Sequence, residues 1–152
     1  MTIIFMERRN VKINRREIVF ADTAAFVALL VRRDEFHQSA NRIMAELSEK
    51  DTKLFVTEMV LVEIANALSA LELRARAVIL IDELQTLPNV EIIWSSIKLF
   101  ESAWSLYRER PDKEWSLTDC ASFVVMKERG INLAFTSDKH FEQAGFVKLL
   151  EK

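Results

Sequence analysis

Four acidic residues are spaced so that one fold could bring their carboxylates together: Asp22, Glu63, Asp119 and Asp138. Gathered carboxylates repel one another, so some of them must protonate or bind cations. Oxygen-only sites suit Mg²⁺ or Mn²⁺, and the chain's two histidines and one cysteine are too few and too dispersed to favour zinc. Such a site can lower the pKa of a bound water and neutralise a phosphodiester during in-line displacement. The acids therefore indicate metal-assisted hydrolysis.

Each acid also has a purely structural interpretation. Asp22 and Asp138 both suit the N-cap of a following helix. Residues 116–119 match a capping box, which satisfies two backbone amides without any chemistry. Glu63 lies among apolar residues and needs a partner if it is buried, and an arginine would suffice. It is the combination of acids that favours a site, while Cys120, next to Asp119 in a helix, is expected to pack rather than to act as a nucleophile.

Short apolar runs alternate with segments of helical periodicity, and this alternation predicts the scaffold that positions the acids. Strands are expected over residues 18–21, 54–56, 90–93, 131–135 and 145–149. Helices are expected over residues 23–33, 35–50, 57–73, the stretch from there to Gln85, 97–107 and 117–129. The 57–73 helix carries more apolar surface than one face needs, so it is expected to be buried on two sides.

Alternating strands and helices form βαβ units, which give an α/β fold with a mainly parallel sheet of four to five strands covered on both faces. Right-handed crossovers place the carboxyl end of every strand at the same edge. Asp22 directly follows the first strand, and Asp138 follows the fourth after two further residues. Asp119 lies in the first turn of a helix, and Glu63 lies beside Asn66 inside the helix after the second strand. We therefore expect the four acids to meet at that edge.

Length and composition set the class of protein. A chain of 152 residues suits a single domain, and an apolar content of 50% with 29% charged residues excludes intrinsic disorder. The formal net charge of −2 does not by itself indicate a nucleic-acid binder. A single cysteine excludes an internal disulfide, and no apolar run approaches the roughly 18 residues that span a bilayer. We expect a soluble, cytoplasmic protein with no membrane contact.

Residues 1–16 differ from the rest of the chain. They carry basic residues at five positions without a sustained hydrophobic period: Arg8, Arg9, Lys12, Arg15 and Arg16. We predict an N-terminal arm over residues 1–16 and one domain over residues 17–152. Met6 as an alternative start stays open.

Four segments carry a resemblance to a known family. They are residues 19–23 (VFADT), 62–68 (VEIANAL), 115–122 (WSLTDCAS) and 136–141 (TSDKHF), the last followed by Gly145-Phe146. In order and spacing they resemble the PIN domain, and in particular the VapC-type ribonuclease toxins of toxin–antitoxin pairs. The resemblance covers residue 18 to the C-terminus, whereas the arm before it departs from the family pattern.

The resemblance implies a three-layer α/β/α sandwich and an endoribonuclease that depends on Mg²⁺, with Mn²⁺ as a substitute. By this likeness Asp22 and Asp119 are the main metal ligands, and Asp138 completes the site directly or through water. Glu63 then holds a water on the metal or a second ion. Thr136 or Ser137 orients these carboxylates.

The resemblance also implies partners. Family members are usually homodimers, and a protein antitoxin fills the groove where RNA would bind. The apolar excess on the helices between residues 57 and 85 would suit a dimer, and Trp94, Trp104 and Trp115 are expected in the core or in an interface.

Two other functions stay open. One is a receiver-like signalling domain that accepts phosphate in an acidic pocket, and the other is a non-catalytic PIN-fold binding module. The sequence does not reveal which RNA would be cut.

Overall fold

A computed structural model describes residues 11–14 and 16–152. Its strands are β1 (Ile18–Ala21), β2 (Lys53–Thr57), β3 (Val90–Ile93), β4 (Leu133–Phe135) and β5 (Val147–Lys148). Its helices are α1 (Thr23–Leu30), α2 (His37–Glu49), α3 (Glu58–Ala67), α4 (Leu71–Thr86), α5 (Ile97–Glu109), α6 (Leu117–Arg129) and α7 (Lys139–Gln143).

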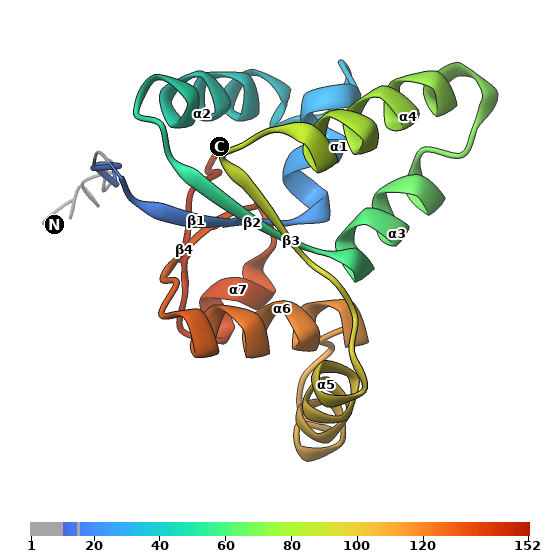
Figure 1. The fold of residues 1–152 in the computed structure, drawn as a ribbon, viewed down its shortest axis with the longest axis vertical. Coiled ribbons are helices and arrows are strands. Elements are labelled where there is room, and N and C mark those ends of the chain that lie inside the picture. The colour runs from blue at the N-terminus through green and yellow to red at the C-terminus, as the bar shows by residue number, and fades with distance from the viewer. Residues whose placement is uncertain (1–10, 15) are drawn as a thin grey trace, which may run out of the picture.

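The five strands form one sheet in the order β3-β2-β1-β4-β5, and every neighbouring pair is parallel. Helices α1, α2 and α4 lie on one face of the sheet, and α6 and α7 lie on the other (Figure 1). The three-layer α/β/α fold with a parallel sheet of up to five strands is therefore confirmed. Because β1 and β4 are neighbours, the acids that follow them are also neighbours.

The neighbouring strands β1 and β4 are deeply buried in the core. Phe20 on β1 and Phe135 on β4 have no exposed surface, which agrees with their continuous apolar runs in a sheet covered on both faces. On the α6 and α7 side, the ring of Phe141 lies 6.2 Å from that of Phe20 and 5.0 Å from that of Phe123. This packing fixes α6 and α7 against the strand ends that carry the acids.

The helix expected over 57–73 ends earlier in the structure. α3 stops at Ala67, and the buried Leu68 leads the chain into α4. The Ser69 hydroxyl donates to the Asn66 carbonyl at the turn, where the sequence has neither glycine nor proline. The expectation of burial on two sides is wrong, because the buried residues Val60, Leu61 and Ile64 lie on one side while Val62 is 54% exposed.

The last two strands are shorter than expected. The segment before β4 is taken up by the end of α6, where Gly130 has a φ of 65° and the Ile131 amide donates to the Met126 carbonyl. This is the Schellman arrangement that glycine favours. β5 covers only two residues, although the Leu149 and Leu150 amides extend the pairing along β4.

The predicted arm lies largely outside the described residues, which begin at Val11 and omit Arg15. Of its described part, Ile13 is buried against the core, and its carbonyl accepts a hydrogen bond from the Lys50 side chain at the end of α2. The boundary between arm and domain stays a prediction. Within the described part of the chain, no helix is long and apolar enough to cross a membrane.

Candidate active site

Asp22 and Asp138 are tied together through one threonine. The Thr136 hydroxyl, just beyond β4, donates to Asp22 Oδ2 at 2.9 Å and accepts from the Asp138 amide at 3.0 Å. The Asp22 amide also donates to the Phe135 carbonyl at 3.1 Å. Thr136 therefore holds the ends of β1 and β4 in one register. Ser137 is half-buried, and its side chain makes no hydrogen bond within the described residues.

Asp119 does close a capping box, as the sequence suggested, but it also faces the other acids. Ser116 Oγ accepts from the Asp119 amide, and Asp119 Oδ2 accepts from the Ser116 amide, both at 3.0 Å. The same Oδ2 lies 2.9 Å from Nδ1 of His140. Burial raises the pKa of Asp119 and the Asp138 charge adds to this, while the bonds from Ser116 and His140 oppose it. The structural and functional interpretations of this residue are thus both compatible with its geometry.

Asp138 is the N-cap of α7, and its Oδ1 accepts from the His140 amide at 2.9 Å. Its carboxylate is half-buried and lies 3.5 Å from the His140 ring nitrogen. Donor atoms of Asp119, Asp138 and His140 all lie within 4.8 Å of one another, so these residues form a group able to hold a metal ion.

Asp22 is the most deeply buried of the four acids, with an exposure of 4%. It occupies the N-cap position of α1 but makes no side-chain capping bond, so capping does not account for it. Burial raises its pKa to about 7, and the charges of Asp119 and Glu63 act in the same direction against the Thr136 hydrogen bond. A carboxylate in this state is stabilised either by a proton or by a cation.

Glu63 lies on α3 and is half-buried. It faces a cavity of about 420 Å³ that is lined by residues from α3, from α6 and from the segment after β3. Its charge helps to raise the pKa of Asp22, which places it on the same side of the sheet edge. Within residues 11–14 and 16–152, no lysine or arginine pairs with any of the four acids. The arginine partner that would have made Glu63 purely structural is not found there.

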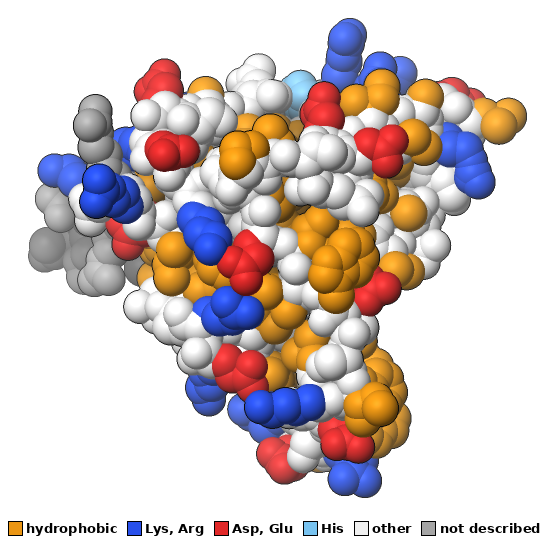
Figure 2. Space-filling model, viewed as in Figure 1, with side chains coloured by type: hydrophobic (Ala, Val, Ile, Leu, Met, Phe, Trp, Pro, Cys, Tyr) orange, Lys and Arg blue, Asp and Glu red, His pale blue; other side chains and the backbone are white. Residues whose placement is uncertain are grey.

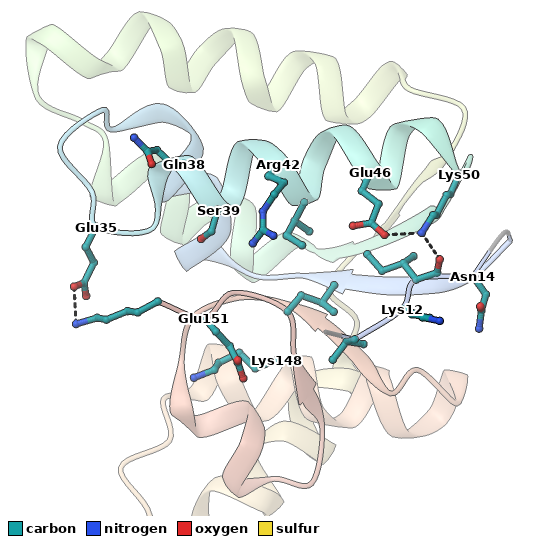
Figure 3. Close-up of a pocket in the computed structure, with 15 residues that line it drawn as sticks. Lys12, Asn14, Glu35, Gln38, Ser39, Arg42, Glu46, Lys50, Lys148 and Glu151 are labelled. Carbon is teal, nitrogen blue, oxygen red and sulfur yellow. Dashed lines mark hydrogen bonds and ion pairs between the residues drawn. The ribbon is translucent and has the colours of Figure 1, made fainter. Parts of the chain in front are cut away.

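Two other features do not belong to the acidic site. A larger groove of about 840 Å³ runs between α2 and the C-terminal segment and contains none of the four acids (Figure 3). Cys120 is fully buried, and this burial raises the pKa of its thiol to about 11. Packing therefore explains Cys120, since it would carry almost no thiolate at neutral pH.

Comparison with known proteins decides the family. Residues 19–147 match the PIN domain. The chain belongs to the PIN domain family. Its sequence is 30% identical to the "23S rRNA-specific endonuclease VapC20" of two Mycobacterium tuberculosis strains over 133 residues, which are 87% of this chain and 98% of the relative.

Solved PIN-family structures show the same fold. The crystal structure of Mycobacterium tuberculosis VapC20, described as a sarcin-ricin loop cleaving toxin, has a TM-score of 0.75 and 29% identity, and the match covers 85% of this chain and 96% of that one. VapBC2 from Rickettsia felis, bound to a DNA fragment from their promoter, has a TM-score of 0.63 at 16% identity, with 86% and 96% covered. The second likeness concerns the fold alone.

PIN nucleases generally use divalent metals, and the donor set of this chain fits such an ion. Asp22, Asp119 and Asp138 offer carboxylate oxygens, which hard divalent cations prefer. In addition, Thr23 Oγ1, next to Asp22, is buried without a hydrogen-bond partner among the described residues. When bound, a divalent ion supplies positive charge at the scissile phosphate and lowers the pKa of the attacking water.

His140 is a residue of this site that the sequence did not predict. In the structure it lies between two of the predicted ligands, Asp119 and Asp138. A signal was present in the sequence, because His140 follows Asp138 by two positions at the start of a short helix. The backbone amide in that position commonly donates to the N-cap side chain, as the His140 amide does to Asp138.

Proposed function

We propose that this chain is an endoribonuclease dependent on Mg²⁺ or Mn²⁺, which hydrolyses RNA phosphodiester bonds as the toxin of a VapBC-type pair. The observation that carries the proposal is the gathering of Asp22, Asp119 and Asp138 at the carboxyl edge of β1 and β4, with no lysine or arginine partner among the described residues. Membership of the PIN family and the similarity to VapC20 support it.

Each acid has a place in the proposed reaction. Asp22, Asp119 and Asp138 hold the divalent ion. The Thr136 hydroxyl fixes the orientation of Asp22 and Asp138. Glu63 lies on α3, near enough for its charge to raise the pKa of Asp22, and positions the water that attacks the phosphorus. Ser137, next to Thr136, is a second candidate for orienting the carboxylates.

Ribosomal RNA is the first substrate to test, because VapC20 is described as specific for 23S rRNA. The tag-free protein is incubated with ribosomes and with total RNA in Mg²⁺ or Mn²⁺, and new 5′ ends are mapped across the whole RNA pool. We expect discrete ends that require the metal and are absent with the Asp119→Asn variant. New ends in messenger or transfer RNA alone would make that RNA the substrate class instead of ribosomal RNA. The absence of any new end with folded protein would contradict the proposal.

A protein antitoxin is part of the proposal. The R. felis neighbour is a VapBC2 structure. We also infer a cytoplasmic location, where RNA substrates and such an antitoxin are both present. In the mapping assay, a cognate antitoxin is expected to suppress the new ends.

A homodimer is the oligomeric state we propose, with α5 as its contact surface. Phe100, Trp104 and Tyr107 are all more than 40% exposed and stack along one side of α5, with ring centroids 6.3 and 5.5 Å apart. Figure 2 shows hydrophobic side chains gathered over this helix. Exposed apolar patches rimmed by polar residues commonly mark protein interfaces.

The Trp104→Glu variant tests this surface. We expect sedimentation velocity to show a dimer for the native chain and a monomer for the variant, because a charge would be desolvated in the contact. Leu71→Glu is the matched control, since Leu71 is 90% exposed at the start of α4. A dimer that survives Trp104→Glu but is lost with Leu71→Glu would place the contact on α4 instead.

A further inference from the structure

The imidazole of His140 lies between two of the proposed metal ligands. Its Nδ1 is 2.9 Å from Asp119 Oδ2 and 3.5 Å from Asp138 Oδ1. Only 17% of the side chain is exposed. The backbone holds it there, because the His140 amide donates to Asp138 Oδ1 at 2.9 Å in the first turn of α7.

The spacing of these three donor atoms suits ligands of a single ion. An octahedral Mg²⁺ or Mn²⁺ with bonds of about 2.1 Å has neighbouring ligands about 3 Å apart. The distances from Nδ1 to the two carboxylate oxygens are close to that spacing, at 2.9 and 3.5 Å. All three donors also lie within 4.8 Å of one another, so one ion could touch each of them with small adjustments.

Apart from the 2.9 Å contact with Asp119, no hydrogen bond within the described residues occupies Nδ1 of His140. Asp119 Oδ2 already accepts the Ser116 amide, so the capping box keeps this carboxylate in place whether or not His140 bonds to it. Nε2 of His140 has no partner among the described residues. The ring can therefore carry its proton on Nε2, which leaves the lone pair of Nδ1 directed at the acids.

We propose that Nδ1 of His140 is a direct ligand of the divalent ion, beside Asp119 and Asp138. The inference rests on the metal site of the proposed function and adds a nitrogen donor to it. Imidazole suits transition-metal ions, whereas Mg²⁺ strongly prefers oxygen. A mixed nitrogen and oxygen site therefore binds Mn²⁺ in preference to Mg²⁺ more strongly than carboxylates alone would.

The chain contains its own control histidine. Of its two histidines, His37 lies at the start of α2, where Nδ1 is 2.7 Å from the Ala28 carbonyl and Nε2 is 3.2 Å from Asn41. These bonds occupy both ring nitrogens of His37. If a histidine nitrogen couples to the bound ion, comparing the single variants His140→Gln and His37→Gln shows which histidine supplies it.

The test uses the full chain without a histidine tag, loaded with Mn²⁺ and measured by pulsed electron paramagnetic resonance. We expect ¹⁴N coupling to Mn²⁺ in the native chain and in His37→Gln, and its loss in His140→Gln. Native protein grown on ¹⁵N-histidine is expected to replace the ¹⁴N coupling by a ¹⁵N coupling, which needs no variant to fold. Calorimetric titration is expected to show that the ratio of Mn²⁺ to Mg²⁺ affinity falls about tenfold or more in His140→Gln.

Three negative results have different meanings. Stoichiometric Mn²⁺ binding without nitrogen coupling in the native chain would overturn the assignment of His140 and leave the proposed nuclease intact. The absence of Mn²⁺ binding in the native chain would overturn both, because the site itself would then not hold the ion. An unchanged affinity ratio in a folded His140→Gln variant would also count against His140 as a ligand.

Discussion

Replacing Asp119 by Asn is expected to lower the kcat/KM of RNA cleavage by at least about 1,000-fold, or about 4 kcal/mol of transition-state stabilisation. The substitution removes one negative charge from the group that holds the ion. Its amide oxygen can still accept the Ser116 amide, so the first turn of α6 should be kept. The loss of activity would then report on metal chemistry rather than on folding.

A short RNA that carries the mapped cleavage site gives the rate, and circular dichroism gives the fold. Asp112→Asn is the matched control, because Asp112 is an exposed acid that pairs with Arg110 at 2.9 Å in the loop before α6. We expect that variant to cleave at the native rate. Native-like cleavage by Asp119→Asn at several metal concentrations would contradict the site.

The metal-free protein is expected to become less stable as the pH rises from about 4 to above 7, and Asp22 contributes most to this loss, with Asp119 acting in the same direction. The pKa of Asp22 is raised to about 7 in the folded chain from an ordinary value of 3.8, so the folded state binds more protons than the unfolded state within this window. The free energy of unfolding must then fall with pH, by at most about 1.4 kcal/mol per unit. Over the whole window the upper limit is about 4 kcal/mol.

Asp22→Asn removes the loss of stability that Asp22 causes at high pH, because the amide does not ionise. In EDTA at pH 8 we expect the variant to unfold at a higher urea concentration than the native chain, while near pH 4 the two should be similar. Mn²⁺ should stabilise the native chain at pH 8 by binding only the folded state, and it should do much less for the variant. A native stability that increases between pH 4 and pH 7 in EDTA would contradict the assigned state of Asp22.

The parts of this site that follow strands could be predicted from the sequence. Asp22 comes directly after an apolar run and Asp138 comes three residues after another, and the rule that parallel strands end at one edge is enough to bring them together. The alternation of strands and helices also predicted a sheet covered on both faces. It could not reveal that Asp22 would lack a capping bond, because that depends on side-chain orientation at the start of α1.

Two features that the sequence did not predict, the position of His140 and the break between α3 and α4, depend on tertiary packing. His140 approaches Asp119 only because α6 and α7 pack together through Phe123 and Phe141, a contact that no local pattern encodes. The break between α3 and α4 was missed for a related reason, since the buried Leu68 stabilises a turn without glycine or proline.

The position of β4 in the sheet also has a consequence for the synthesis of the protein. β4 pairs with β1 in the centre of the sheet, and the bond between Thr136 and Asp22 joins residues 114 positions apart. A nascent chain folds from its N-terminal end as it leaves the ribosome. The growing chain therefore carries Asp22 and Glu63 long before Asp138 emerges. The group of carboxylates that forms the proposed site is therefore incomplete until residue 138 has left the ribosome.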